Sequence, residues 1–361
     1  MISLWWRQIQ SVIRLEMKKT FFAKRGLWVY LLALAPSLIW LGHSINTIQN
    51  AEQRRALATA HPVNSVAMHS VTIGMDLEEV TKTLGEPYAR NELFRPRGPA
   101  QGPVRNQVER LSYTDGESDM RITAIDGVVR GIRLQDRCNI SKDSLVFATV
   151  FQFFYLRLAV FFGCVGIFMN LFRGEMIDKS LHFYLLAPIR REVLLVGKFL
   201  AGLVATTVIF TSGTALQFLA LSWHYDPGAV GAFLQGSGWN QIGAYLGVTA
   251  LACLGYGSVF LAAGLLFRNP LIPAAVVLLW EAANLFLPVK LKKISVIFYL
   301  QSLCPVVAPP QDMPALLRLL ISSAEAPSAM VSIFGLLAVT AVVLVVASLK
   351  ARKLEINYST D

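Results

Sequence analysis

The sequence is poor in charge and in cysteine. Only 16% of its 361 residues are Asp, Glu, Lys or Arg, whereas 54% are hydrophobic. Soluble domains contain roughly 25% charged residues, so much of this chain must lie in a non-aqueous environment. The four cysteines show no CxxC or Cys/His spacing, which argues against a structural zinc site or a dense disulfide framework.

The sequence also lacks the motifs of an ATPase. It contains no Gly-x-x-x-x-Gly-Lys-Ser/Thr loop to hold phosphates, and Gly197-Lys198 lacks the preceding glycine. An intramembrane enzyme would need paired histidines, a nucleophilic serine motif or paired carboxylates, yet none of the five histidines lies deep in an apolar stretch. We therefore predict that the chain is not an enzyme and has no catalytic, metal-binding or cofactor-binding residues of its own.

What the sequence has in abundance is long apolar stretches. A bilayer core of ~30 Å needs about 17–25 helical residues, because backbone groups in lipid must be satisfied within the segment. Six stretches reach or approach that length: 26–43, 145–172, 199–223, 242–267, 271–288 and 329–348. The sequence thus predicts an all-α polytopic membrane protein with six transmembrane helices, five of them within residues 145–348.

The distribution of basic residues predicts the orientation of these helices. Basic residues precede the first stretch in segment 1–25, lie between the second and third, and follow the last in the tail 349–361. The positive-inside rule places these segments, and both termini, in the cytoplasm of a bacterium, with the chain in its inner membrane. The predicted outer segment 289–328 contains a few basic residues, contrary to the positive-inside rule. Within this segment, the sequence of residues 312–321 predicts a short helix. A disulfide between Cys138 and Cys304 stays open, because both are then on the oxidising side.

Segment 44–144 differs from the rest in having equal numbers of basic and acidic residues. Asp76 and Glu79 form a capping-box pattern for a helix that should end at Gly85. Three alternating segments follow a loop at 95–102, and Asp126-Gly127 is a strong turn signal between the last two. The three segments are 108–113, 120–125 and 128–134. We predict a small extracytoplasmic α+β domain inserted between the first two transmembrane helices.

The core of this segment, residues 72–136, resembles the BamE/SmpA-like family. The residues that carry the resemblance are Gly74-Met75, Glu79-Val80 and Leu84-Gly85-Glu86-Pro87. The resemblance implies a role in protein–protein contacts. A spacer packed on the membrane surface is an equally open reading.

The connection at 174–191 has the pattern of a short amphipathic helix. Apolar residues recur at near-helical spacing among charged ones, and Pro188 ends the pattern. Such a helix can lie on lipid or in a groove on a partner protein.

This connection resembles that of the ABC-2 type permeases. The matching positions are Glu175, Ser180, Leu185, Leu186, Ala187, Pro188, Arg191, Gly197 and Lys198. The resemblance implies a dimeric permease, acting as an exporter, whose coupling helix binds a cytoplasmic ATP-binding subunit that holds ATP and Mg²⁺. The residues it assigns to that interface are Glu175, Met176, Lys179, Ser180, Phe183, Leu186, Pro188, Arg190 and Arg191. A membrane-anchored assembly factor acting through the BamE-like domain is the alternative.

Two further features bear on function. Segment 1–25 combines Trp, Ile, Val and Leu with Arg and Lys, which predicts an interfacial amphipathic helix, although a simple membrane anchor is equally open. Arg157 and Glu281 lie within apolar stretches, where charge is costly unless it faces the protein interior or a wet cavity. We hypothesise that they pair or line a polar path, with a purely structural salt bridge as the alternative.

Overall fold

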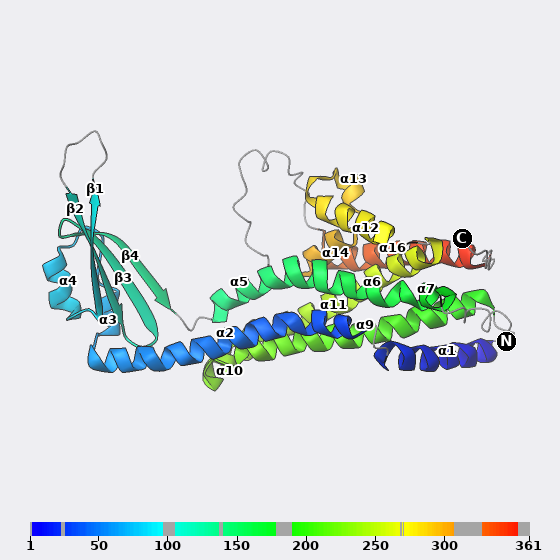
Figure 1. Cartoon of the computed structure of the whole chain (residues 1–361), viewed down its shortest axis with the longest axis horizontal. Helices are drawn as coiled ribbons and strands as arrows, with labels where there is room; N and C mark the ends of the chain where they lie inside the picture. The colour runs from blue at the N-terminus through cyan, green and yellow to red at the C-terminus, as the bar shows by residue number, and fades with distance from the viewer. Residues whose placement is uncertain are drawn as a thin grey trace. The chain divides into compact units, whose positions relative to one another are not determined.

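The structure is a computed structural model that describes residues 2–22, 26–96, 105–136, 140–177, 190–267, 269, 271–306 and 327–352. The chain divides into two compact units (Figure 1). Unit 1 comprises Met1–Trp40, Asp143–Leu221 and Val230–Asp361, and unit 2 comprises Leu41–Lys142 and Ser222–Ala229.

Unit 1 is built from helices. Its elements are α1 (Ile2–Phe22), the first part of α2 (Leu27–Ala60), α5 (Ile140–Val150), η2 (Phe151–Val160), α6 (Phe161–Phe168), α7 (Asn170–Ile177), α9 (Arg191–Ser222), η3 (Leu234–Gly238), α11 (Trp239–Leu266), α12 (Leu271–Ala283), η4 (Asn284–Phe286), α13 (Val289–Lys292), α14 (Val296–Leu303) and α16 (Ala329–Arg352). α10 (Pro227–Phe233) begins in unit 2 and ends in unit 1. α11 packs against α6, α7, α14 and α16.

Among the described residues, five helices are long and apolar enough to cross a membrane, one fewer than the sequence predicted. They are Leu27–Ala60, Asp143–Phe172, Arg191–Ser222, Pro227–Leu266 and Ala329–Arg352. The stretch 271–288 forms only the 13-residue α12, about 20 Å long at 1.5 Å per residue, before a 3-10 turn interrupts it. That is shorter than the ~30 Å core of a bilayer. The prediction of six spans is therefore not confirmed.

Apolar side chains remain exposed along the helices at the rim of unit 1. Phe334, Val342 and Val345 of α16 are each more than half exposed, as are Leu31 and Leu38 of α2. A water-soluble domain would bury such side chains. Together with the five long apolar helices, this exposure indicates a multi-pass membrane protein.

Unit 2 contains a four-stranded antiparallel sheet in the order β1-β2-β3-β4. The strands are β1 (Ala89–Pro96), β2 (Arg105–Thr114), β3 (Ser118–Ile125) and β4 (Val128–Asp136), and two short helices precede them, α3 (Ser65–Met68) and α4 (Leu77–Leu84). The sequence predicted three strands and missed β1. Its residues Ala-Arg-Asn-Glu-Leu-Phe-Arg-Pro do not alternate cleanly, and β1 forms by pairing with β2, with Arg90 donating to Glu109 over 2.6 Å.

The core of unit 2 lies between α4 and one face of the sheet. Val80 and Leu84 of α4 are buried together with Leu111, Tyr113 and Ile122. The buried residues of β3 alternate along the strand, as a sheet with one covered face requires. Unit 2 therefore has a hydrophobic core of its own.

Two local features of unit 2 show how its helix and hairpin are fixed. Asp126 and Gly127 both have positive φ, as a two-residue turn between β3 and β4 requires. α4 ends at Leu84 with Gly85 at φ 82°, as predicted. The predicted capping box is wrong, because the Asp76 side chain makes no capping hydrogen bond. Instead, the Leu77 amide donates to the Gly127 carbonyl over 2.8 Å.

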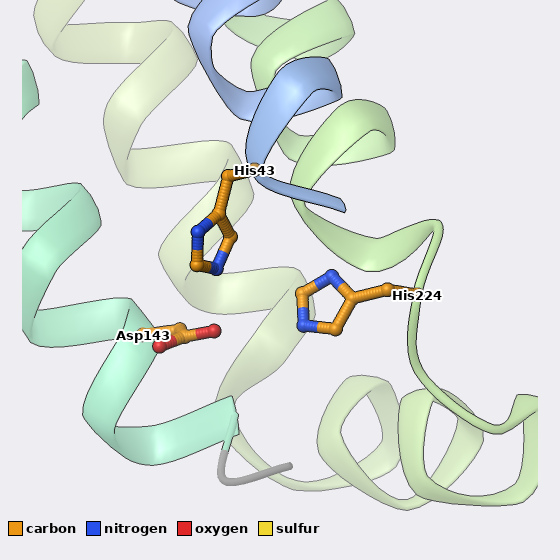
Figure 2. A group of neighbouring side chains, drawn as sticks. All are labelled: His43, Asp143 and His224. Atoms are coloured by element: carbon orange, nitrogen blue, oxygen red, sulfur yellow. The ribbon is translucent and has the colours of Figure 1, made fainter. Parts of the chain in front are cut away.

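Two histidines of unit 2 join the segment Ser222–Ala229 to the later part of α2. The rings of His43 and His224 meet edge to face with centroids 5.5 Å apart (Figure 2), and Ser44 Oγ lies 3.0 Å from His224 Nδ1. The contacts of His43 and Ser44 with His224 hold the segment Ser222–Ala229 against α2 within unit 2.

Candidate coupling site

The predicted coupling segment is only partly described. α7 ends at Ile177 and α9 begins at Arg191. Glu175, Arg190, Arg191 and the backbone of Met176 are described. The other predicted interface residues lie outside the described residues: Lys179, Ser180, Phe183, Leu186 and Pro188.

α9 begins eight residues before the predicted span at 199. This early start places Gly197 and Lys198 inside the helix, about two turns from its first residue. Lys198 is fully buried, which is rare for lysine unless it is paired. The sequence indicated Gly197-Lys198 only as the beginning of a span.

Lys198 is the centre of a group of four charged side chains, three of them buried and Lys19 half-exposed, which we call the charge cluster: Glu16, Lys19, Glu175 and Lys198. Lys198 Nζ lies 2.7 Å from Glu16 Oε1, 2.8 Å from Glu175 Oε2 and 2.8 Å from the Leu171 carbonyl oxygen. Lys19 Nζ lies 3.0 Å from Glu175 Oε1. Of the three oxygens near Lys198 Nζ, Glu16 Oε1 and the Leu171 carbonyl oxygen accept hydrogen bonds from Lys198, whereas Glu175 Oε2 is an ion-pair contact. The cluster connects three elements, α1, α7 and α9.

The charges of the cluster balance, with two lysines facing two glutamates. Burial alone would raise the pKa of Glu175, but Lys198 and Lys19 outweigh that effect and hold the pKa below its ordinary value of 4.5. A carboxyl group whose pKa is lower in the folded state than in the unfolded chain stabilises the folded state fully at pH values above its ordinary pKa. This stabilisation is lost as the pH falls through the lowered pKa. The Glu175 contacts are therefore fully formed at neutral pH.

α1 also approaches the first turns of α9 at two further places. A Cβ at Gly197 would lie 2.9 Å from Val12 Cβ, so the absence of a side chain allows the two helices to pack closely. The guanidinium of Arg190 lies 4.9 Å from the ring centroid of Trp5, a cation–π contact. Figure 1 shows α1 beside α9 and α7 along this length.

The start of α9 contacts the end of α16 as well. Arg352 Nε lies 2.6 Å from Glu192 Oε1, and Arg191 Nη1 donates to the Arg352 carbonyl over 2.8 Å. Arg191, predicted to face an ATP-binding subunit, thus also contacts the last described residue of this chain.

The two polar residues predicted within the membrane have different surroundings. Glu281 is buried and accepts hydrogen bonds from Ser295 Oγ (2.6 Å) and from the amides of Val296 and Ile297 (both 3.0 Å), so it caps the start of α14. Arg157 lies in η2 with its guanidinium 5.2 Å from the Phe153 ring. Within the described part of the chain the two side chains form no ion pair. Glu281 therefore has a structural partner in α14.

Sequence reasoning missed Glu16 and Lys19. The pattern of segment 1–25 places Lys19 among its exposed cations and gives Glu16 no role, whereas in the structure Glu16 is 3% exposed and faces Lys198. A signal was available, because Glu16 is the only acidic residue in a segment otherwise charged by Arg and Lys. Cys138 lies outside the described residues, and Cys304 has a free thiol.

Long apolar helices and an N-terminal helix joined to the connection between two of them define a multi-pass membrane protein. The model of the ABC-2 family transporter proteins matches residues 46–352, which is most of the chain. The chain therefore belongs to the ABC-2 transporter family, a family of membrane transport components. No curated protein and no solved structure matches it significantly. The matched family agrees with the resemblance found in the sequence.

Proposed function

We propose that this chain is the permease subunit of an ABC exporter that uses ATP hydrolysed by a separate cytoplasmic subunit. The observation that carries the proposal is an ion pair between the two described flanks of the segment 178–189. Glu175, three residues before residue 178, and Lys198, nine residues after residue 189, form one buried ion pair. A displacement of the segment is thereby passed to α9, a long apolar helix.

The physical reason lies in the cost of separating buried charges. Removing one partner of a buried ion pair typically costs about 3–5 kcal/mol, because the other charge is left unpaired. The two flanks should therefore move together. We propose further that the chain works as a dimer in the bacterial inner membrane, with both termini in the cytoplasm and with ATP and Mg²⁺ bound only by the partner.

Co-purification tests the proposed partner. The chain is expressed with an ABC ATP-binding subunit encoded beside its gene, and we expect the two to purify together. Phe183→Asp or Leu186→Asp should abolish the association, because a carboxylate cannot enter an apolar cleft without a partner. Lys82→Glu on the exposed surface of α4 is the matched control and should retain it. Retention with both aspartate variants would contradict the coupling assignment.

Thiol labelling tests the orientation. In a chain without its four native cysteines, Ser180→Cys should react with a membrane-impermeant maleimide only after the cells are opened. Glu78→Cys, in the exposed first turn of α4, is the control and should react in intact cells. Labelling of Ser180→Cys in intact cells would place the connection outside and overturn the proposal.

Unit 2 suggests a second candidate role, in protein–protein contacts. Its own core supports an independently acting module, and its helix followed by antiparallel strands is compatible with the BamE-like resemblance. Replacement of residues 65–136 by a short flexible linker tests this role. If ATP-binding subunit association survives while a copurifying outer protein is lost, unit 2 is the interaction module.

A further inference from the structure

The charge cluster bears on a question that the proposed function leaves open, namely what α1 does. An amphipathic basic helix at the N-terminus has an ordinary interpretation as an anchor lying on lipid. An anchor of this kind would hold one face on the lipid headgroups and would need no buried polar contact with the rest of the chain. The contacts of α1 differ from that expectation.

α1 places its one acidic side chain in the interior of unit 1. Glu16 is buried and its carboxylate lies 2.7 Å from Lys198 Nζ, although the two residues are 182 positions apart in the sequence. Val12, one turn earlier on the same face, is 4% exposed and packs at Gly197. The basic residues Arg7, Arg14 and Lys18 lie on the exposed face. The buried face of α1 is thus matched to α9 in shape and in charge.

α1 is joined to α7 as well as to α9. Lys19 Nζ contacts Glu175 Oε1 of α7, while the other oxygen of Glu175 contacts Lys198. A single carboxylate therefore bridges a lysine of α1 and a lysine of α9. No two of the three helices can separate without breaking an ion pair of the charge cluster.

We propose that α1, α7 and α9 form one mechanical body that moves as a unit when the ATP-binding subunit closes, with Lys198 as the positioning residue that joins them. This inference rests on the proposed function and extends it. α1 is a moving part of the coupling apparatus rather than a stationary anchor. Its exposed face is basic, as in a helix that lies at the surface of a membrane.

Distance measurements between spin labels test the proposal in the complex with the ATP-binding subunit. The first label pair, Arg14→Cys on α1 and Val196→Cys on α9, lies within the proposed body. The second pair, Arg14→Cys and Leu266→Cys at the end of α11, spans its boundary. All three labelled positions are exposed, and the native cysteines are replaced.

On trapping the complex with ATP and vanadate, we expect the first distance to stay constant and the second to change. If both distances change, α1 slides against α9 and the inference fails while the proposed function stands. If neither changes, or if no complex with the ATP-binding subunit forms, the proposed function itself fails. The two failures are therefore distinguishable.

Removal of the central lysine sharpens the test. Lys198→Met should leave the association with the ATP-binding subunit intact but broaden the first distance distribution and remove the nucleotide-dependent shift of α1. Lys19→Met, at the half-exposed rim of the cluster, serves the same purpose if Lys198→Met fails to fold. Lys18→Met is the matched control, since it removes a neighbouring exposed lysine, and should behave as the unmodified chain. An unbroadened distribution in Lys19→Met and in Lys198→Met would overturn the role of the cluster.

Discussion

The two units of this chain differ in the kinds of side chain that pack in their interiors. Unit 2 buries alternating apolar side chains against a short helix, and among the described residues its core contains Leu, Val, Ile, Met, Tyr and Ala. Unit 1 brings helices together at glycines and inserts charged side chains where they meet. A Cβ on Gly264 would lie 2.9 Å from the Met169 backbone, and Lys198 is fully buried.

The difference follows from the solvent around each unit. In water, burial of apolar surface drives folding, so unit 2 is stabilised by the area that it hides. In lipid that driving force is absent between helices, and close packing at small residues together with interhelical polar contacts must replace it. The stability of unit 1 should therefore be sensitive to small increases in buried side-chain volume, whereas the stability of unit 2 should be sensitive to losses of buried side-chain volume.

The largest effect is expected from a loss of volume in unit 2. Ile122 is fully buried in β3, and Ile122→Ala should destabilise the unit by about 2–5 kcal/mol. Hydrogen exchange of peptides from residues 105–136 of the full chain measures the loss of protection. Val66→Ala, at a residue that is 77% exposed, is the control and should leave exchange unchanged. Equal hydrogen exchange in the two variants would contradict a core that is stabilised by the burial of apolar side chains away from water.

A gain of volume in unit 1 should have the next largest effect. Gly264→Ala forces a Cβ toward the Met169 backbone, where no flexible side chain can move aside, and overpacking of this kind costs about 1–3 kcal/mol. The melting temperature of the detergent-purified chain should fall. Gly247→Ala lies on the same helix with nothing within 4 Å of its added Cβ, so it should be neutral. Identical melting of the two alanine variants would refute the close approach of α11 to the junction of α6 and α7 at Met169.

The smallest effect is a response of unit 2 to high pH. Burial raises the pKa of Tyr113 to about 12. A tyrosine whose pKa is higher in the folded state than in the unfolded chain stabilises the folded state fully at pH values below its ordinary pKa of 10.0. This stabilisation is lost as the pH rises from 10.0 through the raised pKa of the folded state. We expect a loss of order 1–2 kcal/mol, seen as new proteolytic cuts within residues 105–136 at pH 11. Tyr113→Phe should remove the pH dependence, and if it persists in that variant, another group is responsible.

Local sequence signals predicted several elements well. Asp126-Gly127 marked the turn between β3 and β4, Gly85 marked the end of α4, and the apolar runs marked the long helices. In each case the information lies within a few neighbouring residues, because turns need positive φ and membrane helices need an uninterrupted apolar length. β1 was missed because its residues become a strand only through pairing with β2.

By itself, the sequence determined that this is a membrane protein without an ATPase motif, and its connection at 174–191 indicated the family that the comparison then showed. Only the tertiary structure decided that Glu16, Glu175 and Lys198 meet, and that the apolar stretch 271–288 is divided into α12 and a 3-10 turn. The physical reason is distance along the chain. The α1 residues Glu16 and Lys19 are 182 and 156 positions from Lys198 and Glu175, so their ion pairs leave no local periodicity or spacing to read and depend on how the helices pack.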